Sequence, residues 1–322
     1  MIRYLKHKEI DLNKWDDCIS QAINGIFYAY AWYLDMVSPS WDAIVENDYE
    51  SVMPLPRRTK WGVEYVYQPY FVQQLGVFST VSLSPAVVER FMAAIPRRFV
   101  YGDICLNTFN ALKSAAGRKL YQLKTFELDL IQDYPGLQKN YSANTGRNLR
   151  KAQKSGIFVA PHGQPEDIIE AFRQNRGSSL GSFSAKDYLV LMHLIYSGMH
   201  KGMAKTYAAY TAENTFCAGA VFFFSHNKAV FLFSGMTEAA RSNGAMFMLI
   251  DYFIREHAGK ELVLDFEGSS DPGLARFYGG FGAKECVFLR VIINRMPLIF
   301  KPVLLLYTLF KHGTTGGGTK IQ

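Results

Sequence analysis

Apolar and polar positions alternate over residues 203–237 and predict three antiparallel strands joined by short polar turns. The runs are MAKTYAAYTAEN (203–214), FCAGAVFFFSHN (216–227) and KAVFLFSGMT (228–237). Helical spacing follows over 244–259, then a strand (260–268), a short helix (271–280) and another strand (283–293). A meander that gives way to alternating strands and helices predicts one mixed sheet with helices on its faces.

The N-terminal half has a similar mixture of patterns. Helices are predicted at 13–25 and 84–96, the second with Ser84 as N-cap and Pro85 in its first position. Strand-like runs cover 41–69, 97–106 and 119–130, and the pattern breaks near residue 133 before a basic helix that stops at Gly156. We therefore predict a mixed α/β fold with domains at 1–132 and 133–295 and a closing segment and tail at 296–322.

Composition narrows the class of protein only slightly. A chain of 322 residues is long enough for two domains, and 49% hydrophobic with 20% charged residues is typical of a globular protein. The formal charge of +7 suits an anionic partner but also simple solubility, so it does not decide between them. The four cysteines are scattered without a C-x-x-C pair, so we expect no metal site and no disulfide scaffold.

Two segments bear on membrane association. The N-terminus lacks the apolar region of a signal peptide, which predicts a cytoplasmic protein. The apolar stretch 296–310 is interrupted by Pro297, Lys301 and Pro302 and is shorter than the roughly 20 apolar residues that a spanning helix needs. We expect a buried closing segment, with peripheral membrane contact as the alternative.

A glycine-containing turn precedes the helix predicted at 244–259. Such a turn offers unpaired backbone N–H groups and the positive end of the helix dipole, which suit a pyrophosphate. The alternative is an ordinary helix start that tolerates a glycine. The candidate cofactor-binding residues of this turn are Arg241, Ser242, Asn243, Gly244 and Ala245.

The basic helix before Gly156 carries its cations on one face. Arg147, Arg150, Lys151 and Lys154 are spaced at i, i+3, i+4 and i+7. A solvated surface explains this stripe. The alternative is that Arg147, Arg150 and Lys151 bind phosphates of a nucleotide-linked substrate or of a tRNA acceptor end.

The serial order of these features resembles the Fem-type transferases and their GNAT-fold relatives. The matching stretches are YSANTGRNLRKAQKSGIFV, the meander, RSNGA and LDFEGSSDPGLARFYGGFGA, and the likeness covers essentially the whole chain, most strongly 141–285. The resemblance implies two GNAT-like domains in tandem. It further implies that the first domain, which includes YAYAWYLDMV and YQPYFVQQLG, supplies substrate-binding residues at Tyr30, Trp32, Gln68, Gln73 and Gln74. Core packing is the alternative role for each of these five.

Two departures from the family pattern leave the donor open. The turn resembles the acyl-CoA-binding pattern of Arg or Gln, two residues, Gly, any residue, then Gly or Ala, but Met246 stands at the last position. Fem enzymes that use aminoacyl-tRNA usually carry a lysine after the phenylalanine that corresponds to Phe277, and here that residue is Tyr278. Acetyl-CoA or another acyl-CoA and aminoacyl-tRNA are therefore both possible co-substrates.

The resemblance also implies where the chemistry takes place. In GNAT folds two central strands separate, and the first would bind the acyl carbonyl through its backbone at Phe233, Ser234, Gly235 and Met236. Asp265 and Glu267, two apart on the next predicted strand, would share a face and are candidate bases. Glu267 bonded to the following turn is the alternative. Tyr278 is a candidate proton donor to a leaving thiol.

We therefore expect an N-acyltransferase that moves an acyl or aminoacyl group to an amine, on a small molecule or a nucleotide-linked cell-envelope precursor. The absence of a Ser/His or Cys/His signature fits direct transfer without a protein nucleophile. One alternative is a binding protein that retains the fold without catalysis. Another, based on the basic helix, is a nucleic-acid-binding protein, which would show steep salt dependence.

Overall fold

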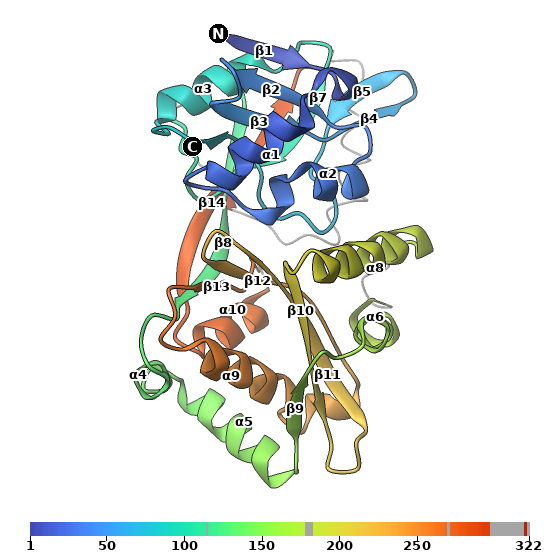
Figure 1. Cartoon of the computed structure of the whole chain (residues 1–322), viewed down its shortest axis with the longest axis vertical. Helices are drawn as coiled ribbons and strands as arrows, with labels where there is room; N and C mark the ends of the chain where they lie inside the picture. Colours follow the sequence, from blue (N-terminus) through green and yellow to red (C-terminus); the bar gives the residue numbers. More distant parts are fainter. Residues whose placement is uncertain (114, 178–182, 269–270, 297–318, 321–322) are drawn as a thin grey trace. The chain divides into compact units, whose positions relative to one another are not determined.

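The computed structural model describes residues 1–113, 115–177, 183–268, 271–296 and 319–320 (Figure 1). Its contacts divide the chain into two compact units, Met1–Lys124 with Cys286–Gln322, and Thr125–Glu285. This division differs from the predicted one at 132/133, because β8 (Lys119–Asp129) and β14 (Lys284–Asn294) each begin in one unit and end in the other. The pattern break near residue 133 is the end of β8 and not the limit of the first unit.

The first unit contains two sets of paired strands. In one, the order is β1-β2-β3-β6 with antiparallel pairing; in the other, it is β4-β5-β7-β14, with β5 and β7 parallel. The strands are β1 (Ile2–Leu5), β2 (Asp42–Glu46), β3 (Ser51–Leu55), β4 (Arg57–Lys60), β5 (Val63–Val66), β6 (Phe78–Ser79) and β7 (Tyr101–Cys105). The short β15 (Thr319–Lys320) pairs with β8 at Tyr121 and Gln122.

Helices of the first unit begin at polar caps. Asp11 accepts hydrogen bonds from the amides of Asn13 and Lys14, and Ser84, as predicted, accepts one from the amide of Val87. The helices are α1 (Leu12–Gln21), α2 (Ala31–Val37) and α3 (Pro85–Ala94), with 3₁₀ turns at His7–Glu9 and Phe27–Ala29. Val88, Phe91 and Met92 of α3 join a core with Ile44 and Met53 of the sheet. This burial supplies the main stabilisation of the unit.

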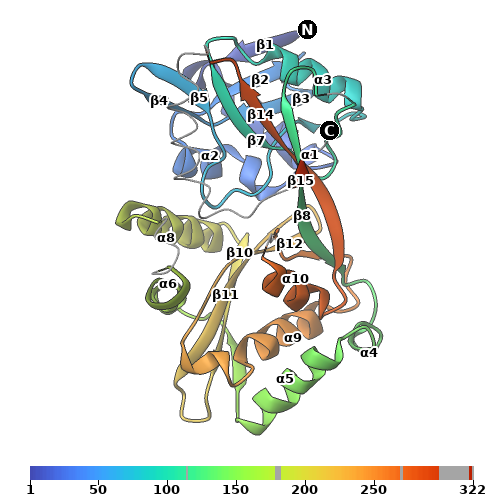
Figure 2. The same cartoon turned by 180° about the vertical axis from the view of Figure 1, so that it is seen from behind.

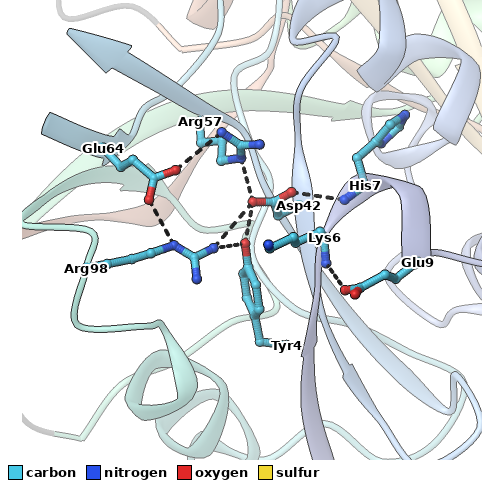
Figure 3. A network of polar contacts seen from close by, with 8 residues as sticks. All are labelled: Tyr4, Lys6, His7, Glu9, Asp42, Arg57, Glu64 and Arg98. Carbon is cyan, nitrogen blue, oxygen red and sulfur yellow. Dashed lines mark hydrogen bonds and ion pairs between the residues drawn. The ribbon is translucent and has the colours of Figure 1, made fainter. Parts of the chain in front are cut away.

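A network around Asp42 fixes the start of β2 (Figure 3). The Asp42 carboxylate is fully buried, and it accepts hydrogen bonds from the Tyr4 hydroxyl and, at 3.0 Å, from the backbone N–H of His7. The guanidinium of Arg57 pairs with it at 2.5 Å, and that of Arg98 lies 3.8 Å away. A buried carboxylate needs such partners, so the network ties β1, β2 and β4 together.

The second unit has one mixed sheet in the order β8-β13-β12-β11-β10-β9. Its strands are β9 (Phe158–Pro161), β10 (Ala204–Tyr210), β11 (Phe216–Ser225), β12 (Lys228–Met236) and β13 (Val263–Asp265), besides the end of β8. β10, β11 and β12 form the predicted antiparallel meander, and β13 pairs parallel to β12. The predicted mixed α/β class is confirmed.

Helices cover both faces of this sheet (Figures 1 and 2). On one face, Ile168 of α6 contacts Gly219 and Gly235, and Gly198 of α8 contacts Phe223. On the other, Phe253 of α9 stacks on Phe222 at 3.9 Å between ring centroids. The helices are α4 (Tyr134–Gln138), α5 (Ala143–Lys154), α6 (Pro165–Phe172), a π-helical turn η3 (Arg173–Gly177), α8 (Ala185–His200), η4 (Ala239–Arg241), α9 (Ala245–His257) and α10 (Pro272–Gly279).

Within the described ranges, no helix is long and apolar enough to cross a membrane. The segment for which membrane contact was considered, 296–310, lies outside the described residues except for Met296.

Candidate active site

A cleft opens in the second unit where β12 and β13 separate. Lys228 to Val230 pair with Val263 to Asp265, and β12 then continues to Met236 although β13 has ended. A cavity of about 1170 Å³ lies beside this unpaired half of β12. Its apolar wall is formed by Phe172, Phe231, Met246, Phe247, Leu274 and Phe277. The separation of these two strands is the feature that the resemblance to GNAT folds implied.

The exposed edge of β12 presents backbone groups to the cleft. The amide of Thr237 donates to the Cys217 carbonyl of β11, so by the alternation of an antiparallel pair the amides of Ser234 and Met236 point away from β11. Ser234, Gly235 and Met236, three of the four residues for which carbonyl binding is predicted, line the cavity. Phe233 is not among the lining residues; its ring packs on Phe172 at 4.7 Å between centroids.

Gly235 lets α6 cross close to β12. A Cβ atom there would lie 2.0 Å from the Ile168 carbonyl oxygen, so only glycine fits this approach. Just after α6, the Asn175 side chain donates to the Met236 carbonyl at 2.9 Å. These two contacts hold the end of β12 in place, and neither Asn175 nor its neighbour Arg176 was recognised from the sequence.

The turn before α9 forms another part of the cleft wall. Arg241 and Gly244 line the cavity, whereas Ser242, Asn243 and Ala245 do not. Gly244 has φ of 80°, and a Cβ there would lie 2.5 Å from the Asn148 carbonyl oxygen of α5. The Ala245 amide is already bonded to the Asn243 side chain at 3.0 Å. The helix start therefore approaches protein backbone on one side and the cavity on the other.

Three arginines contribute positive charge to the cleft. Arg176 lies 3.5 Å from Asp271, and Arg241 lies 3.3 Å from Glu238. Arg276 donates to the Pro272 carbonyl at 3.2 Å. These contacts involve half-exposed or exposed side chains, so the ion pairs contribute little stability and can rearrange around an anionic ligand.

Asp265 is a structural carboxylate at the end of β13. It is 1% exposed and accepts hydrogen bonds from the Thr125 hydroxyl at 2.6 Å and the Glu267 amide at 2.9 Å. Lys228 lies 3.4 Å from it and 2.6 Å from Glu127. Burial raises the pKa of Asp265, and Lys228 opposes that rise. Asp265 does not line the cavity, so it holds β8, β12 and β13 together at the point of separation.

Glu267 departs from the predicted strand. β13 ends at Asp265 and Glu267 has φ of 59°, so the inference that the two carboxylates share a strand face was wrong. The Oε1 atom of Glu267 is buried and makes no hydrogen bond with the described residues. Burial raises the pKa of Glu267 to about 8. A carboxyl group with this pKa can gain and lose a proton near neutral pH.

Tyr278 connects this carboxyl group to the cleft. Its ring stacks on Phe266 at 4.9 Å between centroids, and Tyr278 lines the cavity. Burial, followed by the negative charge of Glu267, raises the pKa of Tyr278 well above its usual value. The hydroxyl therefore remains protonated and can act as a donor.

The docking of α5 on α10 positions Tyr278. The Thr145 hydroxyl of α5 donates to the Gly280 carbonyl at 2.8 Å, and the Ser142 amide donates to the same oxygen at 2.9 Å. Both bonds fix the end of α10 directly after Tyr278.

The candidate substrate residues of the first unit have structural partners. Gln68 accepts from the Cys105 amide at 3.0 Å, and Gln74 accepts from the Thr108 amide at 3.1 Å and donates to Gln73. Tyr30 is the N-cap residue of α2, and the Trp32 ring contacts Tyr33 at 5.4 Å. None of these five belongs to the cleft, which lies within the second unit.

The four basic residues of α5 differ in whether they line a cavity. Arg147 and Arg150 line a second cavity, between α4, α5 and α9, whereas Lys151 and Lys154 do not. All four side chains are exposed, as expected for a stripe on one face.

Comparisons with known proteins give the fold. No protein-family model matches the sequence, and no curated protein matches it. The crystal structure of FemX is similar with a TM-score of 0.64 and 12% identity, over 94% of this chain and 99% of that one. The structure of L-PGS from Bacillus licheniformis is similar with a TM-score of 0.56 and 13% identity, over 94% and 97% of the two chains.

A third solved structure, the C-terminal domain of a putative lysylphosphatidylglycerol synthetase from Agrobacterium fabrum, has a TM-score of 0.56 and 13% identity. The similarity covers 93% of this chain and 96% of that one. At these identities the likeness concerns the fold. Over nearly its whole length, this chain has the fold of FemX, so the predicted resemblance to Fem-type proteins is confirmed for the fold.

Proposed function

We propose that the cleft of the second unit transfers an acyl or aminoacyl group from an activated donor to an amine. The observation that carries this proposal is the cavity at the separation of β12 from β13, with the outward amides of Ser234 and Met236 on one side and the Tyr278 hydroxyl on its wall. Direct transfer requires hydrogen-bond donors to the developing oxyanion, a path for the proton, and a site that holds the donor and the acceptor close together. The two amides supply the first and the Tyr278 hydroxyl supplies the second.

In the proposed reaction, the acceptor nitrogen attacks the donor carbonyl carbon. The amides of Ser234 and Met236 stabilise the negative charge that develops on the carbonyl oxygen. The Tyr278 hydroxyl gives its proton to the leaving atom, and Glu267, which does not line the cavity, reprotonates Tyr278. The amine proton then passes through the Tyr278 hydroxyl to the Glu267 carboxylate. The electrostatic coupling of Glu267 to Tyr278 and the raised pKa of both groups support this exchange.

Two features favour an ester donor, such as an aminoacyl group on the 3′ end of an RNA, over a thioester. A tyrosine with a raised pKa protonates an alkoxide readily, whereas a thiolate, whose acid has a pKa of about 8.5, is a poor acceptor for it. The pyrophosphate of CoA was expected at the start of α9. There the Ala245 amide already donates a hydrogen bond to the Asn243 side chain, and α5 packs against Gly244, so this helix start is less available to a pyrophosphate.

The acceptor is an amine that reaches Tyr278 through the cleft, and a nucleotide-linked cell-envelope precursor remains our candidate. The three cleft arginines support a phosphate on either the donor or the acceptor. A cleft filled by side chains would have favoured a binding protein without catalysis, but the cavity is open.

A binding comparison tests the proposal. Acetyl-CoA and a short RNA carrying a non-hydrolysable 3′-aminoacyl amide are titrated against the protein and its Arg241→Gln variant, with Lys154→Gln as a control of equal charge outside the cleft. We expect the RNA analogue to bind and its affinity to fall in the Arg241 variant alone. Binding of neither ligand would refute transfer by this cleft, and preferential binding of acetyl-CoA would reverse the donor assignment.

A further inference from the structure

A second cavity, of about 710 Å³, lies between α4, α5 and α9 of the second unit. Figures 1 and 2 both show α5 lying along α9. Ser142, at the start of α5, is the residue that lines both this cavity and the cleft. The other residues that line the second cavity do not line the cleft, so the two cavities are distinct. The reaction proposed above does not use the second cavity.

Three arginines surround this cavity. Arg147 and Arg150 project from α5, and Arg255 projects from α9. Neither Arg147 nor Arg150 pairs with a carboxylate of the described residues; the Arg147 guanidinium contacts the Asn144 side chain at 3.4 Å. The Arg150 NH1 atom lies 3.7 Å from the position that a Cβ on Gly146 would take. The Arg150 guanidinium therefore folds back toward the first turn of α5.

The carboxylate of the cavity does not neutralise these two arginines. Asp251 is 4% exposed, and its oxygens accept hydrogen bonds from the Tyr134 hydroxyl at 2.9 and 3.1 Å. Its ion-pair partner is Arg255, at 3.9 Å. Asp251 is thus satisfied within the protein, and the positive charge of Arg147 and Arg150 remains uncompensated.

The start of α5 adds to the same positive field. Ser142 caps the helix by accepting a hydrogen bond from the Thr145 amide. At Gly146, an added Cβ would meet only the Arg150 guanidinium within 4 Å, so the space in front of this turn is open. The helix dipole and the two arginines therefore add positive potential to the same cavity.

We propose that this cavity, the α5 anion site (Arg147, Arg150 and Arg255), binds the phosphate group of a phosphorylated ligand. Arginines one helical turn apart can hold a phosphate through several N–H donors, and a helix start favours the negative charge. The cavity extends beyond the arginines past Tyr134 and Tyr141, which leaves room for the group that carries the phosphate. The ligand is a free phosphomonoester or a lipid headgroup.

The test follows the backbone amide resonances of Gly146 and Arg147 by NMR. Inorganic phosphate, adenosine 5′-monophosphate, and vesicles with and without phosphatidylglycerol are added in separate titrations at fixed ionic strength. A saturable shift with the nucleotide identifies a free phosphomonoester, and a change with anionic vesicles alone identifies a headgroup. No saturable response of these two amides to any of the probes would overturn the proposal.

Two variants that lose the same charge distinguish binding at a defined site from general electrostatic attraction of an anion to the protein surface. Arg150→Gln removes one cation that lines the cavity, and Lys154→Gln removes one from the same helix outside it. We expect the apparent dissociation constant to rise about tenfold in the Arg150 variant, for loss of one charge-assisted contact, and less than twofold in the Lys154 variant. Equal effects would show a diffuse field and would refute the site. Matching melting temperatures of both variants and the unaltered protein exclude a folding defect.

Discussion

Replacing Glu267 with glutamine removes a partly buried ionisable group, whose Oε1 atom is buried, while keeping the size of the side chain. The position has φ of 59°, and glutamine bears the same backbone strain as glutamate there, so the strain cancels in the comparison. Glutamine also resembles the protonated carboxyl group that burial favours. The variant therefore isolates the free-energy cost of ionising Glu267.

The sign and size of that cost follow from its pKa. Burial raises the pKa of Glu267 from 4.5 to about 8, so between these values the folded protein holds a proton that the unfolded chain releases. Because the folded state binds more protons, the stability contributed by this group is complete below pH 4.5 and falls by about 1.4 kcal/mol per pH unit as the pH rises. The loss reaches about 5 kcal/mol above pH 8, as an upper bound.

Urea unfolding followed by circular dichroism at pH 5, 6, 7 and 8 measures this effect. The difference in unfolding free energy between Glu267→Gln and the unaltered protein should grow in favour of the variant with each step in pH. Other titrating groups are common to both proteins and cancel. A difference that stays constant from pH 5 to 8 would show that Glu267 has an ordinary pKa, and the proposed proton exchange with Tyr278 would be refuted.

Three further predictions test the site. Gly244→Ala should cost about 2–4 kcal/mol of unfolding free energy because the new Cβ meets the Asn148 carbonyl, whereas Gly259→Ala, with similar φ but open space, should cost about 1 kcal/mol; equal costs would contradict the close approach. Tyr278→Phe should lower the transfer rate about 100-fold or more with an unchanged melting temperature, and a rate within twofold of the original would remove the tyrosine from the reaction. Lys228→Met should cost about 3–5 kcal/mol in chemical denaturation because it removes the ammonium group that lies beside both Glu127 and Asp265, and a loss below 1 kcal/mol would contradict that role.

The meander and its order were predictable because local periodicity determines them. Alternation over 203–237 specified three strands, and the turns between them were short and polar. Gly244 was recognised as part of the turn before the helix, although the sequence could not reveal that a carbonyl of α5 lies against it.

The cleft wall was only partly predictable because it depends on contacts between distant segments. Asn175 reaches β12 only because α6 crosses at Gly235, and no local pattern in the sequence encodes that crossing. The end of β13 was placed too late, since the apolar and polar alternation continues past Asp265 while the backbone turns at Glu267. Asp265 and Glu267 therefore do not share a strand face.

If the cleft transfers an acyl group to an amine, a small amine can replace the unknown acceptor. Hydroxylamine is incubated with an aminoacylated RNA and, separately, with acetyl-CoA, and hydroxamate formation is measured for the unaltered protein and for Tyr278→Phe. We expect protein-dependent formation of hydroxamate from the aminoacyl ester, at a rate that falls about 100-fold in the variant. A rate equal to that without protein for both donors, or one unaffected by the loss of the tyrosine hydroxyl, would contradict it.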